Sequence, residues 1–200
     1  MTDRRLVVTL AGTAVVAAVV LLAVLGGARD GDDGDAAGSD PDTPTTTVDL
    51  SSVPNEELER VVAENPDIVP MRLRLVERYL RANELANAQL HAEEAVVRAT
   101  TIEDRARAQR YLGWTTALLG DPEQGEGLIV QSLALDPSNR DGLYFLARVR
   151  FEQLDDPAGA LEPLEILVET EMGDEQRSLI ETLLAEVQVA VAASTTTTVG

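Results

Sequence analysis

The residue types that most often carry catalysis are scarce in this sequence. It has no cysteine and a single histidine, His91, which lies beside Glu93 and Glu94. No serine or aspartate nucleophile with a recognisable motif lies near it, so we favour a solvated or half-packed histidine over a general base. Adjacent acids such as Asp155 and Asp156 point to different faces of a helix or lie in a turn. We therefore predict no catalytic residue and no enzyme.

Metal and cofactor sites are not expected either. The acidic run at residues 30–35 invites a calcium interpretation, but no spacing in it gives alternating oxygen ligands, a turn glycine and a distal glutamate. We interpret it as a solvated spacer. The formal net charge is −19, and a surface of that sign repels nucleic acid. We expect no metal, no cofactor, no small-molecule substrate and no nucleic-acid partner.

Arginines and aromatic residues recur at helical spacing. Arg107, Arg110 and Trp114 are separated by three and four residues, so they share one face of a helix. Further along the chain, Tyr144, Arg148 and Phe151 follow the same spacing after Asp141. Trp, Tyr and Arg are the residue types that dominate binding hot spots in protein interfaces. These stripes favour binding of another protein.

An apolar segment near the N-terminus predicts a membrane anchor. Residues 6–25 contain no charged side chain, and a helix of about 20 residues spans the hydrocarbon core of a bilayer. Arg4 and Arg5 precede it, so residues 1–5 are expected in the cytoplasm and the rest of the chain outside it. A cleaved signal peptide is the alternative; the length of the apolar stretch favours an uncleaved single-pass anchor. Residues 26–53, rich in Gly, Asp, Pro, Ser and Thr, predict a disordered acidic linker.

The chain that follows repeats with a period of 34 residues. In residues 106–139 the pairs Leu112-Gly113, Gly120-Asp121 and Asp136-Pro137 mark a helix, a turn and the end of a second helix. This unit resembles the tetratricopeptide (TPR) family. Similar units are expected at 69–102 and 140–173, with a half repeat before them, so that the repeats cover 54–173. An amphipathic capping helix over 174–193 and a disordered tail over 194–200 complete the prediction.

The resemblance implies an all-α, right-handed TPR-type solenoid of about eight helices, preceded by the transmembrane helix. In TPR proteins the first helix of each repeat lines a groove that holds a peptide. The alternative is that the aromatic side chains only fill gaps between helices; we favour the groove for Trp114 and Tyr144, and the sequence does not decide for Phe151. The predicted groove residues are Leu73, Glu77, Arg107, Arg110, Trp114, Tyr144, Arg148 and Phe151.

A narrower resemblance concerns the partner. The stretches LERVVAENPD and ALDPSNRDGLYFLARVRFEQLDD, with the final helix rich in Leu and Glu, resemble the exported TPR domain of cytochrome c biogenesis factors. That resemblance implies a bacterial cytoplasmic-membrane protein whose outer domain binds apocytochrome c or a maturation complex. The alternative is a structural scaffold of a cell-envelope complex that self-associates through the capping helix.

Three residues within predicted helices need an explanation. Gly125 and Gly127 each cost a helix about 1 kcal/mol relative to alanine. We expect both to allow close approach of neighbouring helices. Pro163 lacks a backbone N–H, so we expect its helix to begin near Gly159, where that donor would be unused in any case.

Overall fold

The computed structural model describes residues 53–197, with side chains to residue 194, and this part of the chain is entirely helical. The all-α prediction is therefore confirmed for these residues. Residues 1–52, which include the predicted anchor and nearly all of the predicted linker, lie outside it, as do residues 198–200. Within residues 53–197, no helix combines the length and apolarity needed to cross a bilayer. The helices are α2 (Asn55–Glu64), α3 (Val69–Arg81), α4 (Leu85–Arg98), α5 (Ile102–Leu118), α6 (Pro122–Leu135), α7 (Arg140–Glu152), α8 (Pro157–Val168) and α9 (Asp174–Thr197).

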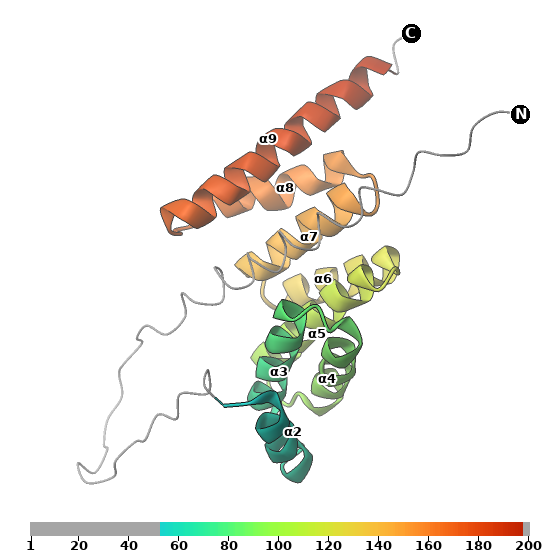
Figure 1. Ribbon diagram of the computed structural model, residues 1–200. Coiled ribbons are helices and arrows are strands. Elements are labelled where there is room, and N and C mark those ends of the chain that lie inside the picture. Colours follow the sequence, from blue (N-terminus) through green and yellow to red (C-terminus); the bar gives the residue numbers. More distant parts are fainter. Residues whose placement is uncertain (1–52, 198–200) are drawn as a thin grey trace, which may run out of the picture.

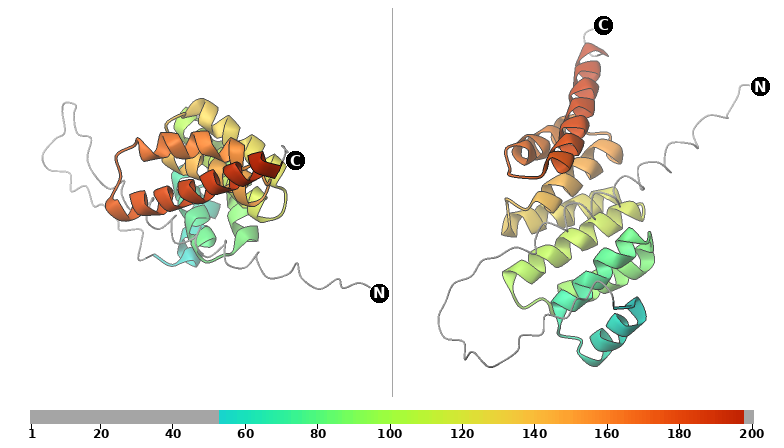
Figure 2. Two further views of the ribbon diagram at one scale, coloured as in Figure 1. Left: turned by 90° about the horizontal axis from the view of Figure 1, so that it is seen from above. Right: turned by 60° about the vertical axis from the view of Figure 1, so that its left-hand side comes forward.

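The helices stack in chain order, from α2 at one end to α9 at the other (Figures 1 and 2). Each helix packs against the next, and α3 also contacts α5, as α5 contacts α7. The pairs α3–α4, α5–α6 and α7–α8 occupy the three predicted repeat ranges, although α5 starts at Ile102, four residues before the predicted unit. We call α3, α5 and α7 the first helices, and α4, α6 and α8 the second helices.

Side-chain caps fix where several of these helices begin. The side chains of Thr101, Asp121, Asn139 and Asp156 each accept a hydrogen bond from the backbone N–H three residues ahead, at 2.8–3.1 Å. Such a bond satisfies one of the amide donors that a helix leaves unpaired at its N-terminus. The caps open α5, α6, α7 and α8, so the start of each helix in two successive pairs is encoded locally.

Helices α5 and α6 approach closely at Gly113 and Gly125, as expected for Gly125. A Cβ atom on Gly125 would lie 2.6 Å from the carbonyl oxygen of Gly113, and one on Gly113 would lie 2.7 Å from the carbonyl oxygen of Gly125. Any larger residue at either position would push the helices apart. The expectation is wrong for Gly127, because a Cβ there would meet nothing within 4 Å.

The prediction for Pro163 is also wrong, and the structure shows why. Helix α8 begins at Pro157, so Pro163 lies inside it and leaves the carbonyl of Gly159 without its usual helical donor. The Arg150 guanidinium on α7 supplies the missing hydrogen bond, from Nη1 to the Gly159 oxygen at 2.9 Å. Its Nε also donates to Glu126 Oε1 on α6, at 2.6 Å. One arginine therefore joins three consecutive helices.

Candidate functional site

The predicted groove residues lie on the three first helices, which are neighbours in the stack. Leu73 and Glu77 are on α3; Arg107, Arg110 and Trp114 are on α5; Tyr144, Arg148 and Phe151 are on α7. They divide into side chains that belong to the core and side chains that form polar contacts between first helices.

Trp114 belongs to the core, so its assignment to a partner-binding groove is wrong. Its side chain is 1% exposed and stacks on Phe145 of α7, with ring centroids 4.7 Å apart and an interplanar angle of 9°. Leu73 is likewise fully buried. The helical spacing placed Trp114 on the correct side of α5, but the neighbouring first helix covers that side. Trp114 therefore stabilises the stack and offers no surface to a partner.

Tyr144 and Phe151 also pack inward. Tyr144 is 5% exposed, and its ring lies beside Phe145 with centroids 6.2 Å apart. Its hydroxyl oxygen accepts a hydrogen bond of 2.7 Å from Arg148 Nη1, which comes from the next turn of α7. Phe151 is half-buried against the core. The aromatic groove expected from the sequence is thus not formed by these rings, since packing between helices covers them.

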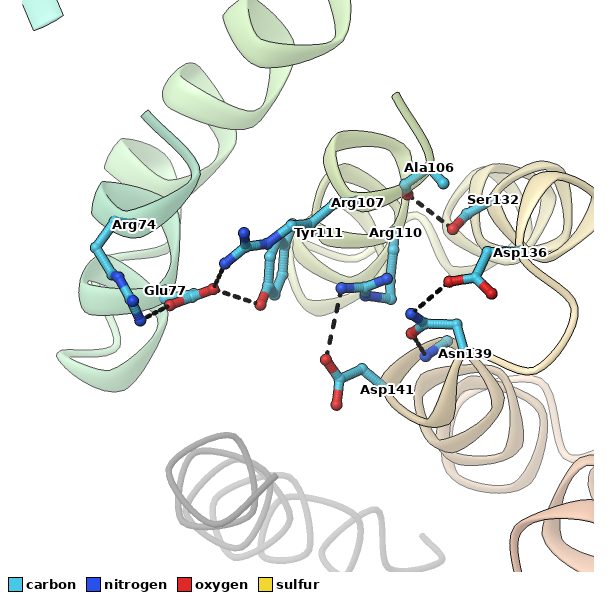
Figure 3. Close-up of polar contacts among 11 residues, drawn as sticks. Arg74, Glu77, Ala106, Arg107, Arg110, Tyr111, Ser132, Asp136, Asn139 and Asp141 are labelled. Carbon is cyan, nitrogen blue, oxygen red and sulfur yellow. Dashed lines mark hydrogen bonds and ion pairs between the residues drawn. The ribbon is translucent and has the colours of Figure 1, made fainter. Parts of the chain in front are cut away.

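Glu77 is the centre of a polar cluster between α3 and α5 (Figure 3). Its carboxylate is 4% exposed and accepts hydrogen bonds from Arg107, from the Tyr111 hydroxyl at 2.8 Å and from Arg74 Nη1 at 3.1 Å. Burial alone would raise the pKa of the Glu77 carboxyl, but the charge and hydrogen bond of Arg107, helped by Tyr111 and Arg74, hold that pKa below its usual value. Two guanidinium groups share one carboxylate, so this cluster carries a surplus positive charge.

A second polar contact joins α5 to α7. Arg110 is 2% exposed, its Nη2 lies 3.5 Å from Asp141 Oδ2, and its Cζ lies 5.2 Å from the centroid of the Tyr111 ring (Figure 3). Burial of an arginine on this side of the stack requires such partners. Together with the Glu77 cluster, the contact makes a continuous row of charged groups across α3, α5 and α7. We call this row the first-helix face: Arg74, Glu77, Arg107, Tyr111, Arg110 and Asp141. Arg74 and Arg107 are its exposed side chains, at 40% and 36%.

The sequence argument missed Arg74, Tyr111 and Phe145. Glu77, Tyr111 and Phe145 lie 34 residues apart, so they are equivalent positions in consecutive repeats. Equivalent positions on adjacent first helices meet one another: Tyr111 contacts Glu77 on one side and Phe145 on the other. Reading the sequence across repeats at this spacing, and not only along each helix, identifies two of the three missed residues.

Charge is divided between the first and second helices. The first helices together carry ten arginines and five acids, whereas the second helices carry one arginine and six acids. In a chain of net charge −19, the first helices are therefore the cationic part. On the first helices the arginines are interleaved with acids and not with exposed aromatic rings.

His91 is half-packed and lies away from the first-helix face. Its ring stacks on Tyr79 at a centroid distance of 5.5 Å, and its Nε2 lies 4.0 Å from Glu59 Oε1 on α2. Burial, with help from the nearby Arg72 charge, lowers the pKa of His91, against the opposing effects of Glu59 and Glu94. Among residues 53–197, no three His, Cys, Asp or Glu side chains are grouped so that they could hold a metal ion.

Similarity to known proteins is found at the level of structure. No protein-family model and no curated protein matches the chain. Two crystal structures of MamA, a TPR-like helical-repeat protein, superpose on it with TM-scores of 0.51. One is 17% identical and covers 71% of this chain and 89% of its own; the other is 19% identical and covers 69% and 77%. The likeness supports a TPR-like helical-repeat fold for this chain, and at these identities it shows the fold alone.

Proposed function

We propose that this protein binds another polypeptide through the first-helix face. The observation that carries the proposal is the Glu77 cluster: Arg74 and Arg107, 40% and 36% exposed, share one buried carboxylate in a chain that is otherwise strongly acidic. The surplus positive charge of this cluster attracts acidic or carboxylate-bearing segments to this part of the stack. Arginine also pairs with carboxylates through two parallel hydrogen bonds.

We also propose that the module is held outside the cytoplasm by residues 6–25. The support is the uncharged apolar stretch after Arg4 and Arg5, whose orientation follows from the positive-inside bias. Residues 26–53 then act as a tether between membrane and stack. Protease added to intact spheroplasts should digest the stack in this arrangement, and protection of the stack until lysis would contradict it.

The narrower resemblance extends the proposal to a particular partner class. Apocytochrome c, or a protein of its maturation complex, is the partner expected from the stretches that resemble cytochrome c biogenesis factors. Capture from a membrane extract by the full chain in detergent tests this directly. Recovery of cytochrome maturation proteins supports the extension, and recovery of unrelated exported proteins alone contradicts it while leaving polypeptide binding in place.

Two matched charge variants test the role of the first-helix face. The double variant Arg74→Gln and Arg107→Gln removes the two guanidinium groups around Glu77. The control, Arg60→Gln with Arg98→Gln, removes the same charge from α2 and α4. We expect the first variant to weaken partner capture at least tenfold and to reduce its salt dependence, with circular dichroism reporting retained helix. Equal capture by both variants would reject the first-helix face as the binding surface.

A self-associating scaffold is the second candidate, favoured by the capping helix. Helix α9 has 24 residues against 12 in α8 and runs past it at the end of the stack (Figures 1 and 2). It exposes Leu179 at 42% and Val189 at 70%. Sedimentation of the full chain over a hundredfold concentration range distinguishes the candidates. A dimer that Val189→Asp dissociates would support the scaffold, and a monomer throughout would exclude it.

A further inference from the structure

The accessible positive charge of the stack is concentrated near its N-terminal half. Arg74 and Arg107 keep 40% and 36% of their side chains exposed while sharing the buried Glu77 carboxylate. Arg81 on α3 and Arg105 on α5 are exposed as well. A carboxylate approaching this part of the first-helix face gains attraction from the Arg74 and Arg107 guanidinium groups and meets one buried counter-charge that already accepts three hydrogen bonds.

The chain itself carries a segment of opposite charge a short way before the stack in the sequence. Residues 30–42 contain six aspartates and no basic residue. The segment ends 11 residues before Val53, where the chain enters the stack. The other helices of the stack carry little positive charge: the second helices have six acids and one arginine, and α2 and α9 are acidic too. Like charge therefore repels the segment from the second helices, α2 and α9.

We propose that the acidic segment at residues 30–42 docks on the first-helix face at Arg74 and Arg107 and competes there with the partner polypeptide. This inference rests on the proposed function, because it assigns a regulator to the same surface. In the free protein the segment screens the surplus positive charge of the Glu77 cluster. A partner must displace it, so a partner with more carboxylates, or with added contacts on α7, is selected over one with few.

Tether length allows this contact. The two ends of the segment, residues 42 and 30, lie 11 and 23 residues before Val53. For a flexible chain these separations correspond to r.m.s. spans of about 18–27 Å. Adjacent packed helices lie about 8–10 Å apart, so both α3 and α5 are within reach of the point where the chain enters at α2. A short flexible tether supplies an effective concentration of order 1 mM. A contact with an intermolecular Kd of about 0.1–1 mM would then occupy the face for half of the time or more.

A synthetic peptide of residues 29–44 is the probe for this competition. It is added to the full chain in detergent at low salt, and to a variant in which the six aspartates of residues 30–42 are replaced by asparagine. We expect the peptide to bind the neutralised variant about two- to tenfold more tightly than the unaltered chain, because its own segment no longer occupies the face. The matched control replaces six exposed glutamates of the second helices and α9 by glutamine and leaves peptide affinity at the unaltered value: Glu93, Glu123, Glu162, Glu165, Glu181 and Glu186.

Distance measurement tests the contact without any added ligand. Because the chain has no cysteine, paired spin labels can be placed at Gly38→Cys and Pro70→Cys, one turn before Arg74 on α3. A second pair joins Gly38→Cys to Gly127→Cys, whose position on α6 is open to solvent. We expect a short, narrow distance distribution for the first pair at low salt that broadens in 0.5 M salt and in the aspartate-neutralised background. The second pair should stay long and broad throughout.

The outcomes separate the two proposals. Equal peptide affinity for the unaltered and neutralised chains, or identical salt-independent distances for both label pairs, would overturn docking of the acidic segment. The capture experiment on the Arg74 and Arg107 variant is then repeated in the neutralised chain. If capture still depends on these two arginines, the first-helix face remains the polypeptide-binding surface and only its self-occupation is wrong.

Discussion

Gly125 and Gly127 lie two residues apart on α6, yet replacing each by alanine should change the free energy of unfolding in opposite directions. Both substitutions remove the helix-propensity cost of glycine, which favours alanine by about 1 kcal/mol. At Gly127 nothing lies within 4 Å of the new methyl group, so that gain is kept. At Gly125 the methyl group would lie 2.6 Å from the Gly113 carbonyl oxygen and 2.7 Å from the Ala117 Cβ.

The magnitude follows from these distances. A carbon and a carbonyl oxygen need well over 3 Å, so α5 and α6 must separate along the length where they pack most closely. Overpacking of this kind costs about 1–3 kcal/mol, and backbone contacts lie at the high end because no rotamer change relieves them. We therefore expect Gly127→Ala to stabilise by about 0.5–1 kcal/mol and Gly125→Ala to destabilise by about 1–3 kcal/mol. The two variants should differ by roughly 2–4 kcal/mol.

Thermal unfolding followed by circular dichroism at 222 nm measures the difference. For a folded part of this size, 1 kcal/mol corresponds to a Tm shift of about 3 °C, so the two variants should melt about 6–12 °C apart. Urea titration provides an independent check on the free energy of unfolding. Shifts of the same sign and similar size for both variants would refute the close approach of α5 and α6 through Gly113 and Gly125.

Four other predictions concern buried or half-buried side chains. Trp114→Ala should destabilise by about 3–5 kcal/mol in urea titration, because it leaves a cavity beside the first helices; an unchanged midpoint would contradict its core position. Glu77→Gln should cost about 2 kcal/mol at pH 7, and the cost should shrink as pH falls below about 4.5, where the lowered pKa of Glu77 no longer favours the native protein; a pH-independent cost would argue against the cluster. Because the pKa of His91 is lowered, its contribution opposes folding progressively as pH falls below about 6.5, so His91→Gln should flatten the stability profile between pH 7 and 5.5, and parallel profiles would contradict this. Arg150→Met should destabilise by about 1–3 kcal/mol, and by about 1 kcal/mol less in a Pro163→Ala background, where α8 regains its own donor; additive effects would disprove the compensation.

The sequence predicted the helices more completely than the face they present. The pairs Leu112-Gly113, Gly120-Asp121 and Asp136-Pro137 all lie within one 34-residue unit, and such short-range signals place helices and turns along the chain. The role of Trp114 depends on which neighbour covers it, and that neighbour, Phe145, lies 31 residues away on a helix whose rotation is set by the whole stack. Helical periodicity identifies a shared face but does not distinguish a face toward solvent from one toward another helix.

Polar partners were predictable only in part. Glu77 and Tyr111 are repeat equivalents, so their contact could have been found from the 34-residue spacing alone. The bond from Arg150 to the Gly159 carbonyl could not, because it depends on where α8 begins relative to Pro163. Compensation of a missing backbone donor by a distant side chain is a property of the packed helices and leaves no periodic trace in the sequence.

The small side chains of α4 make the two ends of the stack mechanically unequal. The fully buried side chains of that helix are Ala88, Ala92 and Ala95, with Leu85 and Val96 partly buried against the core, and those of α2 are Leu58 and Val62. Two aliphatic side chains contribute far less free energy than the indole and phenyl rings between α5 and α7, so tension or heat will detach α2 while the middle of the stack stays folded. Because the polypeptide enters the stack at α2, a pull transmitted along the preceding residues acts on the weakest joint. The protein would therefore unfold first at that end and only later at its centre.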